Sequence, residues 1–439
     1  MFINFKQRIS TLISNLTSPS KLRFFSIAVI FIIVGIYVTH HARADRLVNE
    51  KGVVQGRDFM AFYTAGKMIN EGNGKELYNP IIQYKTQHEI LAGENWKGLN
   101  YYISPASVAV LYSIFARFPY LIVFHVHTLL MTGFFLTGIF FLKPHLNHMP
   151  KSWGIIGLLG MIWLPMSHTI MAGQNAALVF MLLSLAYSAT LGNQSWKAGL
   201  ALGLLLFKPQ FAMPLLGLLM LQKHYLTIIA ALLVAIGHYL LGGFYCGWDW
   251  PIKMASAIST FYSPEEKIAS GFSHISILEV LNYSIISPWE RIGANSWIID
   301  SIKACGYGLI LIFVGYLIWI CRKTNINKPN YALFWAMTIS ANLLISLHTQ
   351  YYDVAILLLP ILLIVNHQLK NGQPITPFQR FILMLVFFSF PIYNISKLIG
   401  FQPLILLPIG IFYLAKKLFY KDLKPVVSVC PAPLRAEKG

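Results

Sequence analysis

Long apolar runs, almost free of charged residues, constrain this chain more than any other feature of its sequence. Such runs occupy 303–320, 331–347, 352–366 and 380–396, and each approaches the ~20 residues that a helix needs to cross a bilayer. Only 11% of the 439 residues are charged, against about 25% in soluble globular chains. The chain therefore has too few charged side chains to cover a water-exposed surface. The runs are continuous rather than alternating, which favours helices over a membrane β-barrel. The sequence therefore predicts an all-α polytopic membrane protein.

Charged residues are divided unevenly along the chain, and this division predicts its orientation. Of the 16 acidic residues, seven lie in 41–103 and six in 244–301, whereas Lys and Arg remain in the other connections. Since basic connections stay on the cytoplasmic side, we expect the two acidic segments outside and the tail 416–439 inside. The net charge of +18 then reflects orientation, not nucleic-acid binding, because no basic run is interleaved with aromatic residues. We expect one integral membrane domain, 1–439, with about 10–13 spans.

The N-terminal apolar run leaves two interpretations open. Phe24–Val38 follows four basic residues, and we interpret it as an uncleaved first span with a cytoplasmic N-terminus. The alternative is a cleaved signal peptide, because Ala42-Arg43-Ala44 resembles a small-x-small cleavage site.

The run 196–222 is interrupted in its middle by Lys208-Pro209. A residue before proline is pushed out of helical conformation, so we expect two half-spans that meet on the outer side at Phe207–Gln210. Half-helices of ~12 residues rise only ~18 Å, which suggests a recessed, water-filled vestibule. An ionisable residue at such depth indicates function, and Lys208 beside two half-helix ends could hold a phosphate. The structural alternative is a lysine that extends to the interface.

Asp58 is the strongest candidate for chemistry in the first outer segment. It precedes a stretch in which Phe59, Phe62, Tyr63 and Ile69 suit one helical face, and we expect amphipathic helices here, lying on the membrane interface. A carboxylate against such a surface is poorly solvated and becomes a better base. The structural alternative is that Asp58 is the N-cap of a helix over 59–70. The two roles are compatible.

Two further polar motifs lie at the outer tips of apolar hairpins. The stretch Ser346–Asp353 contains His348, Tyr352 and Asp353, of which the histidine could bind a phosphate or orient a carboxylate; an aromatic interfacial belt is the alternative. Gln174-Asn175 occupies another tip, where a polar turn is expected in any case. The histidine pairs lack supporting carboxylates in a metal-ligand pattern, and no HExxH motif occurs, so we expect no metal site and no cofactor.

In order and spacing, these segments resemble glycosyltransferase family 87, the polyprenyl-phosphate-mannose-type mannosyltransferases of the GT-C superfamily. The resemblance covers roughly residues 20–360. Its elements are Asp58-Phe59 with Tyr63, Ala65, Gly72 and Leu77-Tyr78, then Tyr102-Ile103-Ser104-Pro105, Gly173-Gln174-Asn175, Ala198–Gly203, Phe207-Lys208-Pro209, and His348 with Tyr352-Asp353. Ser104 departs from the second proline usual in the family. Segment 244–301 and the last spans carry nothing that can be matched, so the acceptor is not indicated.

The resemblance implies an inverting enzyme that moves a hexose, most simply mannose, from a polyprenyl-phosphate donor to a lipid or glycan acceptor. Asp58 would be the general base. Contact with the donor phosphate, or support of the base, would come from Lys208, His348, Gln174, Asn175, Tyr352 and Asp353. A lipid phosphate leaves readily, so no metal is demanded. The resemblance also implies a multi-pass protein of the bacterial plasma membrane, active on its outer side in cell-envelope glycolipid synthesis, with no nucleic-acid partner.

Two readings from other functional classes stay open. A transporter or flippase of lipid-linked sugars would also use broken helices and ionisable residues near the membrane midplane. It would commonly show internal repeats, and none is visible in this sequence. A purely structural membrane subunit is the third reading, in which the polar tips have no chemical role.

Overall fold

A computed structural model describes residues 47–49, 52–96, 98–149, 151, 153–260, 273–293, 295–346, 348–374 and 376–423, with two isolated positions at 27 and 31. Two expectations from the sequence therefore fall outside the described residues. One is the first span over 24–38, apart from those two positions, and the other is the part of the tail beyond 423.

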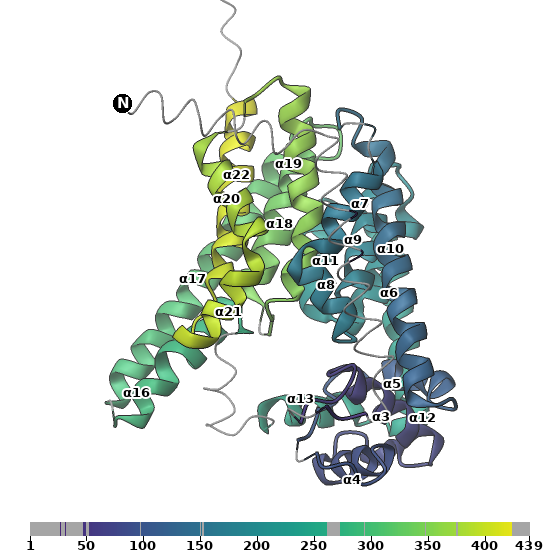
Figure 1. The fold of residues 1–439 in the computed structure, drawn as a ribbon. Coiled ribbons are helices and arrows are strands. Elements are labelled where there is room, and N and C mark those ends of the chain that lie inside the picture. The colour runs from purple at the N-terminus through teal and green to yellow at the C-terminus, as the bar shows by residue number, and fades with distance from the viewer. Residues whose placement is uncertain are drawn as a thin grey trace, which may run out of the picture.

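Helices make up all the regular structure in the described part of the chain (Figure 1). Short 3-10 or π segments are labelled η. The helices are α3 (Phe59–Asn70), η1 (Gly74–Glu76), α4 (Pro80–Ile90), α5 (Ala106–Phe115), α6 (Tyr120–Leu142), η2 (Lys143–His145), α7 (Trp153–Ile162), α8 (Leu164–Met171), α9 (Ala176–Leu191), α10 (Ser195–Leu204), η3 (Leu205–Phe207), α11 (Pro209–Leu221), α12 (Tyr225–Cys246), α13 (Trp250–Thr260), α15 (Ile277–Glu279), η5 (Val280–Ile286), α16 (Ser287–Arg291), α17 (Ser296–Lys323), α18 (Tyr331–Ile345), η6 (Asp353–Leu357), α19 (Leu358–Lys370), α20 (Pro377–Phe387), α21 (Ser389–Ile399), η7 (Pro403–Ile405) and α22 (Leu406–Leu423).

Five of these helical stretches are long and apolar enough to cross a membrane, and two bent pairs raise the number to seven. The long stretches are Tyr120–His145, Tyr225–Cys246, Ser296–Lys323, Asp353–Lys370 and Pro403–Leu423. The bent pairs join α7 to α8 at 68° and α20 to α21 at 75°, and six shorter apolar helices of 10–17 residues accompany them. The all-α polytopic membrane fold is confirmed.

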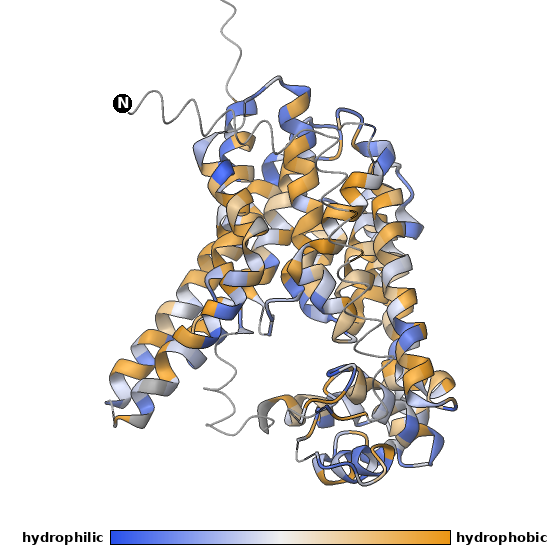
Figure 2. Ribbon diagram, viewed as in Figure 1, coloured by the Kyte–Doolittle hydropathy of each residue, from blue (hydrophilic) through white to orange (hydrophobic). Residues whose placement is uncertain are grey.

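The segments predicted to lie outside gather at one end of the molecule. Figure 1 shows α3, α4 and α13 below the bundle on one side and α16 below it on the other. The last turn of α22, where the basic tail begins, lies toward the opposite end. Figure 2 shows the hydrophobic residues along the bundle helices and the hydrophilic ones concentrated at the two ends. This separation is what an apolar hydrocarbon layer requires of a helical bundle.

Helix α12 shows how the bundle packs with an apolar exterior. Leu232, Leu233 and Ile236 are each more than half exposed, as expected for side chains that face lipid. On the inner side, a Cβ on Gly199 of α10 would lie 2.3 Å from the Thr227 carbonyl oxygen, and one on Gly203 would lie 2.6 Å from Val234 Cβ. Glycine at this four-residue spacing lets the two helix backbones approach closely.

The break at the centre of 196–222 is confirmed. Helix α10 continues through η3 to Phe207, and α11 begins at Pro209 with only Lys208 between them. Lys208 has φ −126° and ψ 77°, an extended conformation that its following proline favours. The side chain of Lys208 therefore projects from a helix break.

The described part of the first acidic segment, 41–103, packs as a compact unit. Nine of the twelve residues of α3 are buried, whereas α4 buries only three of eleven. Helix α3 lies against α5, where a Cβ on Gly66 would be 2.5 Å from the Tyr112 carbonyl oxygen. The Phe59 ring lies 5.4 Å from that of Tyr120 and 5.5 Å from that of Phe124. This packing anchors the start of α3, and with it the position of Asp58.

Candidate functional site

Asp58 occupies the N-cap position of α3 but does not cap it. The helix begins at Phe59 as the sequence predicts, yet the Asp58 side chain makes no cap hydrogen bond. Its Oδ2 instead accepts a hydrogen bond of 2.7 Å from Gln174 Nε2. The side chain is only partly buried. The carboxylate is thus available for chemistry rather than committed to the helix end.

A tight turn between α8 and α9 brings Gln174 to Asp58. Gly173 has φ +69°, and a Cβ there would lie 2.3 Å from Phe59 Cβ. Glycine is needed on both grounds, because a side chain would strain the backbone and collide with the start of α3. The packing of this turn on α3 therefore positions the amide that contacts the carboxylate.

The surroundings of Asp58 favour its neutral form more than water does. Burial raises the pKa of Asp58, and the Gln174 hydrogen bond and the charges of Arg57 and Lys208 offset this only in part, so that its pKa lies above the ordinary value. A carboxylate with a raised pKa is a stronger proton acceptor when ionised.

Lys208 forms an ion pair with Asp353. Its Nζ donates to Asp353 Oδ1 at 2.7 Å, and the two side chains are only 15% and 4% exposed. The second oxygen, Oδ2, accepts the Gln350 backbone N–H at 3.1 Å. Nζ also lies 5.9 Å from the centre of the Tyr352 ring. Tyr352 and Asp353, predicted from the sequence as a polar tip, thus surround the lysine at the break.

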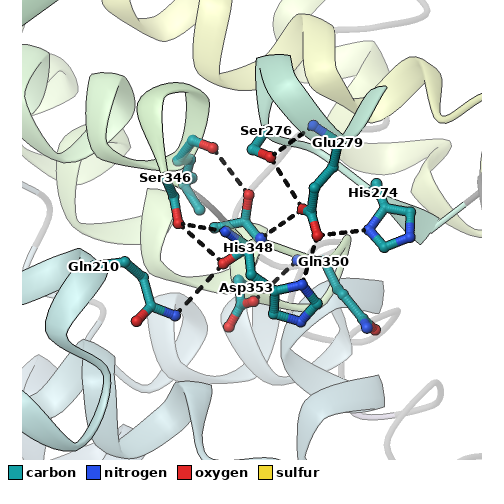
Figure 3. Close-up of polar contacts among 10 residues, drawn as sticks. Gln210, His274, Ser276, Glu279, Ser346, His348, Gln350 and Asp353 are labelled. Carbon is teal, nitrogen blue, oxygen red and sulfur yellow. Dashed lines mark hydrogen bonds and ion pairs between the residues drawn. The ribbon is translucent and has the colours of Figure 1, made fainter. Parts of the chain in front are cut away.

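His348 lies on the same loop and contacts a carboxylate from the second acidic segment, 244–301. Its Nδ1 is 2.5 Å from Glu279 Oε1, and Figure 3 shows the two side chains pointing toward one another. Burial lowers the pKa of His348, but Glu279 and Asp353 raise it more, so that the net pKa lies above the ordinary value. The imidazole is therefore disposed to carry a positive charge near the Lys208–Asp353 pair.

The remaining predicted residue, Asn175, is not part of this arrangement through its side chain. It is buried, and within the described part of the chain its Oδ1 has no hydrogen-bond partner. It is the N-cap residue of α9 without a side-chain cap bond. Of the adjacent pair at this tip, Gln174 contacts Asp58 directly.

Several site residues were not anticipated from the sequence. Arg57 donates to His168 Nε2 at 3.4 Å, and His168 in turn contacts the Tyr351 hydroxyl. This chain of contacts joins the Asp58 segment to the loop that carries His348. Glu279 is the other residue missed, although it is a lone acid in the apolar stretch Ile275–Val280. An isolated ionisable residue in apolar surroundings is a signal of function, and the same signal identified Lys208.

Glu279 is the centre of a larger polar cluster. His274 Nδ1 lies 3.2 Å from Glu279 Oε1, the oxygen that also contacts His348. The other oxygen, Oε2, accepts from the Thr349 backbone N–H at 2.8 Å and from Ser276 Oγ at 3.0 Å. The ligand atoms of His274, Glu279 and His348 all lie within 4.8 Å of one another, a spacing suited to a shared cation.

Comparison with known proteins identifies the family. The model of glycosyltransferase family 87 matches residues 102–364, more than half of the chain. Gln174, Lys208 and Asp353 lie within the matched range, and Asp58 lies before it. No curated protein and no solved structure matches the chain. With its apolar helices and the matched range, the chain belongs to glycosyltransferase family 87 and is a membrane glycosyltransferase.

Proposed function

We propose that the protein transfers a hexose, and specifically mannose, from a polyprenyl-phosphate donor to a hydroxyl of a lipid or glycan acceptor. We place the reaction on the outer side of a bacterial plasma membrane, in the synthesis of a cell-envelope glycolipid. Family membership supports sugar transfer. The observation that carries the proposal is the Asp58 carboxylate, which is bound by one neutral amide and whose neighbour Arg57 is joined through His168 to the loop that carries Asp353.

Asp58 is the general base of the proposed reaction. Its carboxylate accepts the proton of the acceptor hydroxyl while the hydroxyl oxygen forms a bond to the anomeric carbon of the sugar. The bond between that carbon and the phosphate oxygen breaks on the opposite face, so the configuration inverts. The lipid phosphate departs with the electron pair of that bond. A partly desolvated carboxylate with a raised pKa suits proton acceptance.

The leaving phosphate is stabilised by cations from three segments. Lys208 spends one of its three N–H donors on Asp353, which leaves donors for a phosphate oxygen. Arg57 is exposed beside Asp58, and its guanidinium matches phosphate geometry. The contact of His348 Nδ1 with Glu279 leaves Nε2–H as a third donor. With these charges the departure of the phosphate requires no metal or cofactor in the transfer step.

The rival function is transport or flipping of a lipid-linked sugar. The broken helix pair at Lys208 is its main support, because transporters place ionisable groups at such breaks. Sugar transfer, unlike flipping, requires a group that accepts the proton of the acceptor hydroxyl, and Asp58 can supply it. An assay in detergent distinguishes the two functions, because sugar transfer can proceed there whereas transport has no second compartment to deliver to.

The decisive experiment is incubation of detergent-purified protein with radiolabelled polyprenyl-phosphate-mannose and native membrane lipid, followed by lipid analysis. We expect label in a new lipid product from the parent protein and none from Asp58→Asn. Label that stays entirely in the donor, with movement across proteoliposome membranes, would support the flippase instead. Competition by unlabelled polyprenyl-phosphate-glucose tests the preference for mannose.

The proposed orientation has its own test. The acidic segments place α3 and α13 outside, so a cysteine introduced at position 260 should react with an impermeant thiol reagent on intact cells. A cysteine at position 371, between α19 and α20, should react only after permeabilisation. The reverse pattern would contradict an outward-facing site.

A further inference from the structure

The cluster around Glu279 has features that the proposed transfer does not use. The transfer needs one imidazole donor from His348, yet a second imidazole, His274, points at the same carboxylate oxygen (Figure 3). His274 and Glu279 come from the second acidic segment and His348 from the loop after α18. Within the described residues, this is the group of three metal-ligating side chains that converges.

We propose that His274, Glu279 and His348 bind a divalent transition-metal ion of the zinc class. The ligands are His274 Nδ1, Glu279 Oε1 and His348 Nδ1. Two imidazoles and one carboxylate are a common zinc ligand set, and they leave a tetrahedral position for water. Calcium and magnesium prefer oxygen ligands, so two nitrogens of three ligands select against them. In this structure the same three atoms are joined by direct contacts at 2.5 and 3.2 Å.

The backbone holds the two ligand-bearing segments in register. Ile275 N–H donates to the Thr349 carbonyl at 3.0 Å, and Tyr351 N–H donates to the Ser273 carbonyl at 2.7 Å. These bonds flank an antiparallel bridge between His274 and Gln350. Ligands on separate segments are thereby brought together by the fold rather than by sequence spacing, which lowers the cost of assembling a metal site.

The surrounding contacts orient the ligands as an outer shell does. Ser276 Oγ and the Thr349 backbone N–H hold Glu279 Oε2, which turns Oε1 toward the two histidines. The His274 ring is fully buried and lies 4.1 Å from the centre of the Tyr283 ring. Outer-shell contacts of this kind fix ligand orientation and raise metal affinity. The His348 side chain is 33% exposed and provides the path by which an ion enters.

The ion would join the second acidic segment to the loop that carries Asp353. The ion does not take part in the sugar transfer proposed above, because the phosphate donors Lys208 and His348 Nε2 are not among its ligands. Its effect is on position: it holds His348 and, through the loop, the partner of Lys208. Binding can therefore be measured without donor or acceptor, and the result is independent of the proposed activity.

The test uses full-length protein purified with a tag free of histidine, stripped with a chelator and titrated with Zn²⁺. We expect one equivalent bound, by calorimetry and by elemental analysis after dialysis. Glu279→Gln and His274→Ala should each reduce affinity by more than the about 10- to 100-fold typical of losing an outer-shell contact. Ser276→Ala should fall within that range. The matched control is His148→Ala, an exposed histidine on the α6–α7 connection, which should bind as the parent does.

Co²⁺ provides a measurement that needs no variant. Bound to two imidazoles and a carboxylate, it should give the intense visible absorption of a four- or five-coordinate ion. The proposal is overturned if the parent binds no Zn²⁺, or if Glu279→Gln, eluting as a folded monodisperse protein, binds as well as the parent and His148→Ala do. A Co²⁺ spectrum identical to that of the hydrated ion would overturn it too.

Discussion

Two aspartates near the centre of the site have opposite surroundings. Asp58 accepts one hydrogen bond from a neutral amide, Gln174. Asp353 has a cation on one oxygen and a backbone N–H on the other. The first carboxylate keeps an oxygen for substrate, whereas both oxygens of the second are occupied. The contrast supports the roles proposed for them, which are proton transfer for Asp58 and the placement of Lys208 for Asp353, although both side chains belong to the same residue type.

Replacing Asp58 should give the largest effect. Asp58→Asn keeps the size of the side chain but cannot accept the acceptor proton, so transfer should fall ~100- to 10,000-fold, or about 3–5 kcal/mol of barrier at ~1.4 kcal/mol per tenfold. The melting temperature should barely change, because Asp58 makes no cap hydrogen bond. Transfer by the folded variant within a few-fold of the parent would remove Asp58 as the base.

Asp353→Asn sharpens the comparison from the other side. It leaves Lys208 without its counter-ion in a largely buried position, so stability should fall by about 3 kcal/mol. Lys208→Ala should cost a similar amount and also weaken donor use. In the double variant Lys208→Ala, Asp353→Ala, stability should recover while donor use stays weak. If both stability and donor use recovered, Lys208 would have only a structural role as the partner of Asp353.

Lys208→Arg separates charge from geometry at the same position. The guanidinium keeps the positive charge but donates in a planar fork, so donor use should be retained in part. Kinetics with a short-chain donor, measured as KM and kcat separately, check this expectation. An arginine variant as weak as Lys208→Ala would show that the charge alone does not suffice.

The pH dependence of transfer should reveal the environment of Asp58. The base works only when ionised, and burial raises its pKa above the ordinary value. As pH falls, kcat/KM should therefore decline along an acid limb. This limb should lie at a higher pH than that of an enzyme whose base is an aspartate with an ordinary pKa. In Asp58→Asn the residual activity should lack this limb. An acid limb at the same position in the variant would assign it to another group.

Removing the amide that contacts Asp58 should have the smallest effect of the set. The Gln174 hydrogen bond lowers the pKa of Asp58, so Gln174→Leu should move the acid limb to higher pH. The loss of a hydrogen bond to a charged group is worth about 1.5–3 kcal/mol, which sets the upper bound on the change in transfer. Gln174→Glu should move the limb further in the same direction, because a neighbouring carboxylate also raises the pKa of Asp58.

Much of the site was visible in the sequence as separate elements. The apolar periodicity placed a helix over 59–70, and the structure has it at those residues. The proline at 209 placed a helix break at Lys208. The sequence allows Asp58 to be either a base or a helix cap, and the side chain makes no cap hydrogen bond in the structure. These features are local, since they depend on neighbours within one or two helical turns.

The pairing of those elements was decided by tertiary structure alone. Gln174 and Asp58 are 116 residues apart, Lys208 and Asp353 are 145 apart, and Glu279 and His348 are 69 apart. Composition and charge distribution alone identified this chain as a helical membrane protein. They show which segments are apolar enough to lie in hydrocarbon and which must remain in water. Which polar tips meet depends on how helices pack across the bundle, where a glycine such as Gly173 or Gly199 allows an approach that periodicity does not encode. The sequence marks Glu279 only as an isolated acid, and its contact with His348 is not encoded locally because His348 lies on another segment.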